Sequence, residues 1–261
     1  MHPGPHLEVE TIFFDWGGTL AGVTREAAHW PLCALRACDL VIDKAGRDRS
    51  VAADLLTERF GAALSAAQSD PEHREIDTGT VLAEWGVQVG LGSPEAWPID
   101  RALDAFWQSW VGVLDPIEGA AETLGELKRR GYRLGLVSNV AAPARHAYAE
   151  LFRLGLARWL DGCVLSSVVG HRKPHPAIYE AGIASVHGPG QGTAPGRMLF
   201  VGDGPIYDVA EPQRRGMRTA LVRYTGLSWP TEQLAAVRPD LRIDHVSGLL
   251  DVLPPLVRSS G

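Results

Sequence analysis

The sequence predicts an α/β protein: a parallel β-sheet covered by helices, with a helical segment inserted after the first strand. Two observations carry this prediction. Short apolar runs alternate along the chain with segments of helical periodicity, and turn-forming residues follow the runs. Residues 21–114 break this alternation, because they are rich in Ala, Leu and Arg and contain no convincing run of strands.

Composition narrows the class of protein. The 261 residues are 45% apolar, which suffices for one large hydrophobic core or for a core with a smaller companion. With 25 basic and 31 acidic side chains the net charge is −6, so we expect no nucleic acid bound through a general basic surface. Three cysteines, an odd number in a large chain, indicate no disulfide framework. No apolar stretch reaches the roughly 20 residues of a membrane span, and no Lys or Arg before Arg25 provides the basic start of a secretory signal, so we expect a cytoplasmic protein without membrane partners.

Five runs have the composition of buried strands. The first, residues 9–14, is β-branched and aromatic, and Asp15 and two glycines follow it. The other four are residues 133–137, 162–166, 198–201 and 219–222. Because ligands bind beyond the carboxyl ends of the strands in such sheets, the polar residues that follow these runs are candidate site residues.

Helices are expected between these strands. Residues 118–131 carry apolar side chains at helical spacing and end at Gly131, where a helix C-cap belongs. Pro143 suits the first turn of a helix that runs to about residue 155. Two more helices are expected over residues 176–186 and about 208–215. Pro212 is tolerable only in a first helical turn, so the last of these helices starts late or bends.

The inserted segment is predicted to be a separate helical unit. Val51, Leu55 and Phe60 show its helical spacing. It also contains five of the eight tryptophans, which either form the core of this unit or line a pocket that faces the rest of the protein. We therefore divide the chain into a core of residues 1–20 and 115–261 and an inserted unit of residues 21–114.

Two segments carry residues suited to binding a phosphate group. Asp15 ends the first strand, and Gly17 and Gly18 follow it, so that backbone groups can approach a phosphate or a metal ion closely. Ser138 and Asn139 end the second strand with a hydroxyl, an amide and backbone N–H groups, which suit an anion. Alone, each segment is equally well explained as a turn or a helix cap.

Two further segments supply charge. Lys173, one of only three lysines, is a compact positive charge suited to a phosphoryl oxygen, although a single lysine is usually solvated. Asp203 and Asp208 follow the fourth strand and offer the hard oxygen ligands that Mg²⁺ takes, or they cap the next helix. The specific signal is the order of all four segments along the chain.

In this order, the four segments resemble the motifs of the haloacid dehalogenase superfamily of phosphohydrolases. They read DWGGTL at residues 15–20, SN at 138–139, KP at 173–174 and GDGPIYD at 202–208. The resemblance covers nearly the whole chain outside the insertion. It implies a Rossmann-like core with strand order 5-4-1-2-3, and it identifies the insertion with the helical cap of the type I subfamily.

The resemblance also implies a role for each motif residue. Asp15 corresponds to the nucleophile that accepts the phosphoryl group of a small phosphorylated metabolite, and Lys173 to the residue that neutralises negative charge there. The residues that correspond to the phosphate site are Ser138, Asn139, Lys173 and Thr19. Those that correspond to the Mg²⁺ site are Asp15, Gly17 through its backbone carbonyl, Asp203 and Asp208. This assignment agrees with the needs of phosphoryl transfer, which are an in-line nucleophile and positive charge on the equatorial oxygens.

One position departs from the family pattern. The general acid and base of the family is an aspartate two residues after the nucleophile, and here that position is Gly17. General acid–base catalysis contributes roughly 10²–10⁴ in rate, so its loss is serious. Three explanations stay open: another group supplies the proton, the leaving group needs little protonation, or the protein binds a phosphorylated ligand with little turnover. The candidates for the other group are Glu26, His29, His171 and His175.

The second explanation leads to a phosphonoacetaldehyde hydrolase as an alternative. Those enzymes also have a small residue at the position of Gly17, but they need a cap lysine that forms a Schiff base. Lys44 is the only lysine of the insertion, and its neighbours are polar rather than the apolar setting that lowers an amine pKa. L-2-haloacid dehalogenases also lack the second aspartate but need no metal, so Asp203 and Asp208 argue against that activity.

Overall fold

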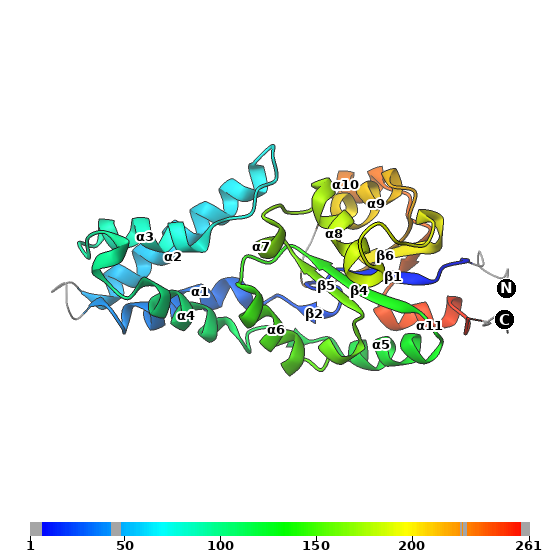
Figure 1. The fold of residues 1–261 in the computed structure, drawn as a ribbon, viewed down its shortest axis with the longest axis horizontal. Coiled ribbons are helices and arrows are strands. Elements are labelled where there is room, and N and C mark those ends of the chain that lie inside the picture. The colour runs from blue at the N-terminus through cyan, green and yellow to red at the C-terminus, as the bar shows by residue number, and fades with distance from the viewer. Residues whose placement is uncertain (1–6, 43–47, 225, 227–228, 257–261) are drawn as a thin grey trace.

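A six-stranded parallel sheet forms the core of the described part of the chain. The computed structural model describes residues 7–42, 48–224, 226 and 229–256. The strands of the sheet are β1 (Thr11–Phe14), β4 (Arg133–Ser138), β5 (Gly162–Leu165), β6 (Met198–Gly202), β7 (Arg218–Val222) and β8 (Leu241–Ile243). Their order is β5-β4-β1-β6-β7-β8, and each neighbouring pair is parallel (Figure 1). The predicted α/β class is therefore confirmed.

The strand order differs from the expected one by an addition. From β7 to β5 the five predicted strands follow the order 5-4-1-2-3. The sixth strand, β8, pairs with β7 and extends that edge of the sheet. The sequence did not predict β8, because this strand has only three residues and none of them is fully buried.

Helices cover both faces of the sheet. On one face, Ile12 and Phe14 of β1 belong to a core shared with α5 (Ala120–Arg129), α6 (Ala144–Arg153) and α11 (Leu249–Val252). On the other face, Phe13 packs in a cluster with Ile178 and Tyr179 of α8 (Pro176–His187). Because both faces are buried, the strands are continuous apolar runs, as is usual for parallel sheets.

The inserted segment contains four α-helices among its described residues. They are α1 (Glu26–Cys38), α2 (Arg49–Ser69), α3 (Thr78–Gln88) and α4 (Ile99–Trp110). Figure 1 shows them to the left of the sheet. They are joined to the core by β2 (Ala21–Gly22) and β3 (Asp115–Pro116), which pair antiparallel. A strand of two residues is too short to show an alternating pattern, so the sequence did not reveal β2.

The remaining elements are short. They are α7 (Ser166–Val169), α9 (Glu211–Arg214) and α10 (Thr231–Ala236). Pro212 lies in the first turn of α9, which begins after a π-helical turn over Pro205–Ala210, so the expected late start is confirmed. Among the described residues, none of the helices combines the length and the hydropathy needed to cross a membrane.

Candidate active site

Three carboxylates and one lysine meet at the carboxyl ends of β1 and β6. Asp15 directly follows β1, Asp203 directly follows β6, and Asp208 lies in the π-helical turn beyond it. One oxygen of each carboxylate lies within 4.8 Å of the others. Lys173 joins them from the loop between α7 and α8, where Nζ donates to Asp15 Oδ1 at 2.8 Å and to Asp208 Oδ1 at 2.7 Å. The fold thus gathers these predicted site residues in one place.

The strand register brings Ser138 to the same carboxylate. Phe14 of β1 is paired with Leu136 of β4, so both strands end at the same edge of the sheet. The Ser138 hydroxyl donates to Asp15 Oδ1 at 2.8 Å. Two donors therefore hold Oδ1, whereas Oδ2 receives no hydrogen bond from the described residues. This geometry leaves one carboxylate oxygen available for a ligand.

Glycines allow the carboxylates to approach the backbone. Gly18 has a φ of +76°, and a Cβ there would lie 2.8 Å from the carboxyl group of Asp203. A Cβ on Gly202 would overlap with the carboxyl group of Asp208. Larger residues at these two positions would therefore displace the acidic side chains.

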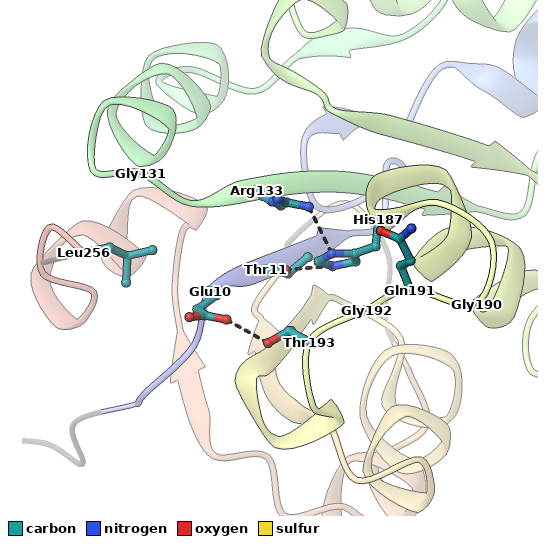
Figure 2. Close-up of a pocket in the computed structure, with 10 residues that line it drawn as sticks. All are labelled: Glu10, Thr11, Gly131, Arg133, His187, Gly190, Gln191, Gly192, Thr193 and Leu256. Carbon is teal, nitrogen blue, oxygen red and sulfur yellow. Dashed lines mark hydrogen bonds between the residues drawn. The ribbon is translucent and has the colours of Figure 1, made fainter. Parts of the chain in front are cut away.

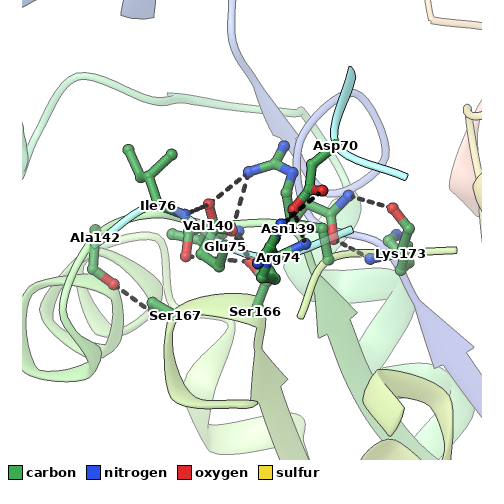
Figure 3. Close-up of polar contacts among 11 residues, drawn as sticks. Asp70, Arg74, Glu75, Ile76, Asn139, Val140, Ala142, Ser166, Ser167 and Lys173 are labelled. Carbon is green, nitrogen blue, oxygen red and sulfur yellow. Dashed lines mark hydrogen bonds and ion pairs between the residues drawn. The ribbon is translucent and has the colours of Figure 1, made fainter. Parts of the chain in front are cut away.

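Asn139 acts on the backbone of the lysine loop. Its Oδ1 accepts from the N–H of Lys173 at 2.6 Å, and its Nδ2 donates to the carbonyl of Lys173 at 3.2 Å (Figure 3). The amide oxygen and one N–H of Asn139 thus hold the backbone of Lys173, and its expected place in the phosphate site stays a prediction. Sequence spacing could not reveal this, because the two residues are 34 positions apart.

The predicted residues of the first loop lie close to this cluster. Gly17 lines the cavity described below. Thr19 is buried, and its hydroxyl has no hydrogen-bond partner within the described ranges. Lys44, the cap lysine that a phosphonoacetaldehyde hydrolase would need, lies outside the described residues.

The buried charges do not balance. Three carboxylates against one ammonium give −3 + 1 = −2. Burial raises the pKa of Asp203 to about 6, and the charge of Asp15 adds to this effect. Burial likewise raises the pKa of Asp208, although Lys173 opposes the shift. Burial alone would lower the pKa of Lys173, but Asp15 and Asp208 more than offset it, so this pKa is raised. The surplus of two negative charges on hard oxygen ligands fits a divalent cation.

A cavity of about 400 Å³ lies between the core and the inserted helices, and the residues that line it include the neighbours of Asp15 and Lys173 in the chain but none of the three clustered carboxylates. The core contributes Gly17, Ser138 and Arg172 to its lining, among others. The insertion contributes Glu26, Trp30, Gln68, Trp107 and Trp110. Two more tryptophans of the insertion, Trp85 and Trp97, pack on each other away from it at a ring distance of 6.0 Å. The tryptophans therefore serve both of the purposes that the sequence left open.

A second cavity, of about 670 Å³, lies at the opposite edge of the sheet (Figure 2). It is lined by Thr11 at the start of β1 and Arg133 at the start of β4. His187 connects them, with Nε2 3.0 Å from the Thr11 hydroxyl and Nδ1 3.2 Å from Arg133 Nη1. It is lined by none of the four motif segments. The first cavity is lined by Gly17 of the first motif and by Ser138 and Asn139 of the second, so the first cavity is the candidate active site.

The loop between α2 and α3 contacts the core beside Lys173 (Figure 3). Glu75 accepts from Arg172 Nη1 at 2.8 and 2.9 Å and from the hydroxyl of Ser166. The backbone N–H of Glu75 donates to the carbonyl of Gly170 at 2.9 Å. This pair was not predicted from the sequence, because the only signal for Arg172 is its place next to Lys173 and Glu75 carries no signal.

The sequence analysis also missed Trp229. Its indole N–H donates to Asp203 Oδ2 at 3.0 Å, which leaves Oδ1 of Asp203 without a hydrogen bond from the described residues. No sequence signal could have found it, because Trp229 belongs to no motif and lies 26 positions from Asp203.

This fold and site define a class of protein: an α/β protein with an acidic site at the carboxyl edge of a parallel sheet and a helical insertion over it. Residues 9–213 match the family model described as haloacid dehalogenase-like hydrolase, and the chain belongs to this family of hydrolases. The resemblance noted in the sequence and the predicted enzyme class are thus confirmed.

Two relatives have similar sequences. Glyceraldehyde 3-phosphate phosphatase from Methanopyrus kandleri is 27% identical over 251 residues, which are 96% of this chain and 99% of that protein. Pyrophosphatase PpaX from Bacillus cereus is 31% identical over 149 residues, 56% of this chain. The chain matches 63% of the length of this pyrophosphatase.

Solved structures confirm the fold. A 2-haloacid dehalogenase from Pseudomonas syringae has a TM-score of 0.65 and 23% identity, with 94% of this chain and 97% of that chain covered. The magnesium-bound hydrolase YfnB from Bacillus subtilis has a TM-score of 0.60 and 16% identity, with 94% and 99% covered. At these identities the likeness shows the fold alone.

Proposed function

We propose that this protein is a Mg²⁺-dependent phosphatase that acts on a small phosphorylated metabolite, with Asp15 as the nucleophile. The observation that carries the proposal is the Asp15 carboxylate, fixed at one oxygen by Ser138 and Lys173 beside a cavity of about 400 Å³. Two relatives named as a phosphatase and a pyrophosphatase support the reaction class.

In the first half of the reaction, Oδ2 of Asp15 attacks the phosphorus. The new O–P bond forms as the bond from phosphorus to the leaving oxygen breaks, which gives an aspartyl phosphate. Lys173 and Thr19 donate to the phosphoryl oxygens and stabilise their charge. The Ser138 hydroxyl has one proton, which goes to Asp15 Oδ1 in the free site, so it joins them only by turning from Oδ1 to a phosphoryl oxygen. Asn139 holds the backbone of Lys173 so that its ammonium keeps this place. In the second half, water cleaves the aspartyl phosphate and restores the Asp15 carboxylate.

The residues that would hold Mg²⁺ are Asp15, the Gly17 carbonyl, Asp203 and Asp208. When bound, the ion supplies positive charge to the phosphoryl oxygens. Asp203 is the better direct ligand of the last two. Both oxygens of Asp208 already accept a hydrogen bond, from Lys173 and from the N–H of Gly204 at 2.8 Å.

The decisive test is the release of phosphate from a panel of phosphomonoesters, with Mg²⁺ and with EDTA. We expect Asp15→Asn to abolish turnover, because an amide is no nucleophile, and EDTA to do the same. Thermal unfolding must show that Asp15→Asn, and the native protein in EDTA, are still folded at the assay temperature. Activity of Asp15→Asn equal to that of the native protein, or activity unchanged in EDTA, contradicts the proposal.

A second candidate function is the binding of a phosphorylated ligand with little turnover. Gly17 favours it, since this position carries the acid and base elsewhere in the family. Restoring the acid separates the two functions. A Cβ at Gly17 would lie 2.9 Å from Cγ1 of Val23, so Gly17→Asp must be combined with Val23→Ala, and Gly17→Ala with Val23→Ala is the matched control.

We expect the restored aspartate to give no gain in phosphate release, because the site is built around glycine. A gain of about 10²-fold or more over the alanine control would instead identify a degraded enzyme. Initial rates with saturating Mg²⁺ make this comparison.

A further inference from the structure

Glu26 is a half-buried carboxyl group in the wall of the candidate active-site cavity, and it forms no ion pair among the described residues. It is the first residue of α1 and lines the same cavity as Gly17 and Ser138. Its Oε1 accepts a hydrogen bond from the indole N–H of Trp110 at 2.9 Å. In the part of the chain that the structure describes, Oε2 receives no hydrogen bond and neither oxygen forms an ion pair. Oε2 is therefore free to contact a substrate.

The other three candidates for a proton donor do not line this cavity. His171 and His175 stack on each other at a ring distance of 3.9 Å, and Nδ1 of His175 accepts from the N–H of Ala177 at the start of α8. His29 is on α1 but is not among the described residues of the cavity wall. The structure thus singles out Glu26.

Arg172 is the other charged side chain in the cavity wall, and it is already neutralised. Its Nη1 contacts both oxygens of Glu75, whose side chain is 2% exposed. Arg172 is therefore committed to the contact between the α2–α3 loop and the core. Glu26 is left as the ionisable group of the wall that can exchange a proton with a bound molecule.

We propose that Glu26 is the general acid and base of this enzyme, in place of the aspartate that the family has at position 17. The proposal rests on the proposed phosphatase function. As Asp15 Oδ2 bonds to phosphorus and the ester bond breaks, the Glu26 carboxyl gives its proton to the leaving oxygen. The Glu26 carboxylate then takes a proton from the water that attacks phosphorus. Inorganic phosphate leaves, and Asp15 and Glu26 return to their starting states.

The surroundings of Glu26 suit this role. Burial raises the pKa of its carboxyl group, and the hydrogen bond from Trp110 opposes part of that shift. A carboxyl group that keeps its proton closer to neutral pH is a better general acid. Since Glu26 belongs to the insertion and Asp15 to the core, the acid joins the site only where α1 packs over the core.

The test compares two leaving groups in Glu26→Gln. Glutamine keeps an acceptor oxygen for Trp110 and nearly the same volume, but it cannot transfer a proton. The measured quantity is kcat/KM, which reports on the formation of the aspartyl phosphate. For an alkyl phosphate we expect a loss of about 10²–10⁴-fold. For p-nitrophenyl phosphate, whose leaving group needs little protonation, we expect a loss of less than about tenfold.

The control is Glu58→Gln, which removes an exposed carboxyl group of α2 outside the cavity and is expected to match the native protein. Thermal unfolding checks that Glu26→Gln is folded. If Glu26→Gln is unstable, Trp110→Phe replaces it in the test, because this variant keeps the Glu26 carboxyl group and removes the hydrogen bond that Trp110 donates to it. Its kcat/KM must then fall more for the alkyl phosphate than for p-nitrophenyl phosphate, by a smaller factor than is expected for Glu26→Gln.

Three outcomes would overturn the role of Glu26: no loss with either substrate, an equal loss with both, or a larger loss with p-nitrophenyl phosphate. Native protein that releases no phosphate from any ester overturns the proposed function itself, and the role of Glu26 with it. The two failures are therefore distinguishable by the activity of the native protein.

Discussion

At the scale of single residues, the site is organised around one oxygen of Asp15. Ser138 and Lys173 both donate to Oδ1, and Asn139 fixes the backbone of Lys173 from the end of the neighbouring strand. Each donor is itself held by a strand end or a second hydrogen bond. Because these hydrogen bonds fix its orientation, the Asp15 carboxylate loses little orientational freedom when it reacts. A site organised in this way before the substrate binds lowers the activation barrier of the reaction.

Asp203 gives a prediction about stability. Burial raises its pKa to about 6 from 3.8, so between about pH 4 and pH 6 the native state holds a proton that the unfolded state has lost. This group's contribution to stability is therefore complete at low pH and is lost as the pH rises through 6. In EDTA, we expect Asp203→Asn to match the native protein below pH 4 and to be more stable above pH 6, by up to about 3 kcal/mol.

The measurement is urea unfolding from pH 3 to pH 8. The control is Asp54→Asn, which removes an exposed carboxyl group and is expected to change stability by less than about 0.5 kcal/mol at every pH. Mg²⁺ should reduce the difference in the free energy of unfolding between Asp203→Asn and the native protein, because the ion compensates the charge of the ionised carboxylates in the native protein. A difference between Asp203→Asn and native protein that is the same at every pH would refute the charge argument.

At the scale of elements, the α2–α3 loop connects the insertion to the lysine loop. Glu75 and Arg172 form a buried ion pair, and the neighbouring backbones exchange hydrogen bonds, since the N–H of Arg172 donates to the carbonyl of His73 at 2.7 Å. Lys173 is the next residue in the chain. The position of Lys173 is thus tied to a loop of the insertion.

Glu75→Gln tests this connection. Removing one partner of a buried pair leaves Arg172 without compensation, so we expect a loss of about 3 kcal/mol in the free energy of unfolding. We also expect a lower kcat, because the Lys173 loop loses its support. Arg74→Gln is the matched control, since it removes the exposed pair with Asp70 in the same loop and should change stability by less than about 1 kcal/mol. Equal effects of the two substitutions would show that the buried pair has no special role.

At the scale of the whole molecule, both connections to the insertion are anchored in the core. Glu150 is fully buried and accepts from the N–H groups of Gly112 at 2.7 Å and Leu114 at 3.1 Å, just after α4. Near the first connection, the hydroxyl of Tyr224 accepts from the N–H of Val23 at 3.1 Å. These contacts hold α1 and α4 over the carboxyl edge of the sheet, where Figure 1 shows them. The cavity exists because of this placement.

The sequence by itself determined the fold class, four helices of the core in outline, and the set of motif residues at the sheet edge. It could do so because strand alternation with helices is a local pattern, and parallel strands place their carboxyl ends together whatever their order. Only the tertiary structure decided which of the candidate proton donors lines the same cavity as Gly17. Glu26 was one of four candidates in the sequence, and the packing of α1 and α4 brought it, and not the histidines, to the cavity. The same holds for Asn139, Glu75 and Trp229, whose partners lie 26 to 97 positions away, because such contacts depend on how elements pack and leave no periodic trace in the chain.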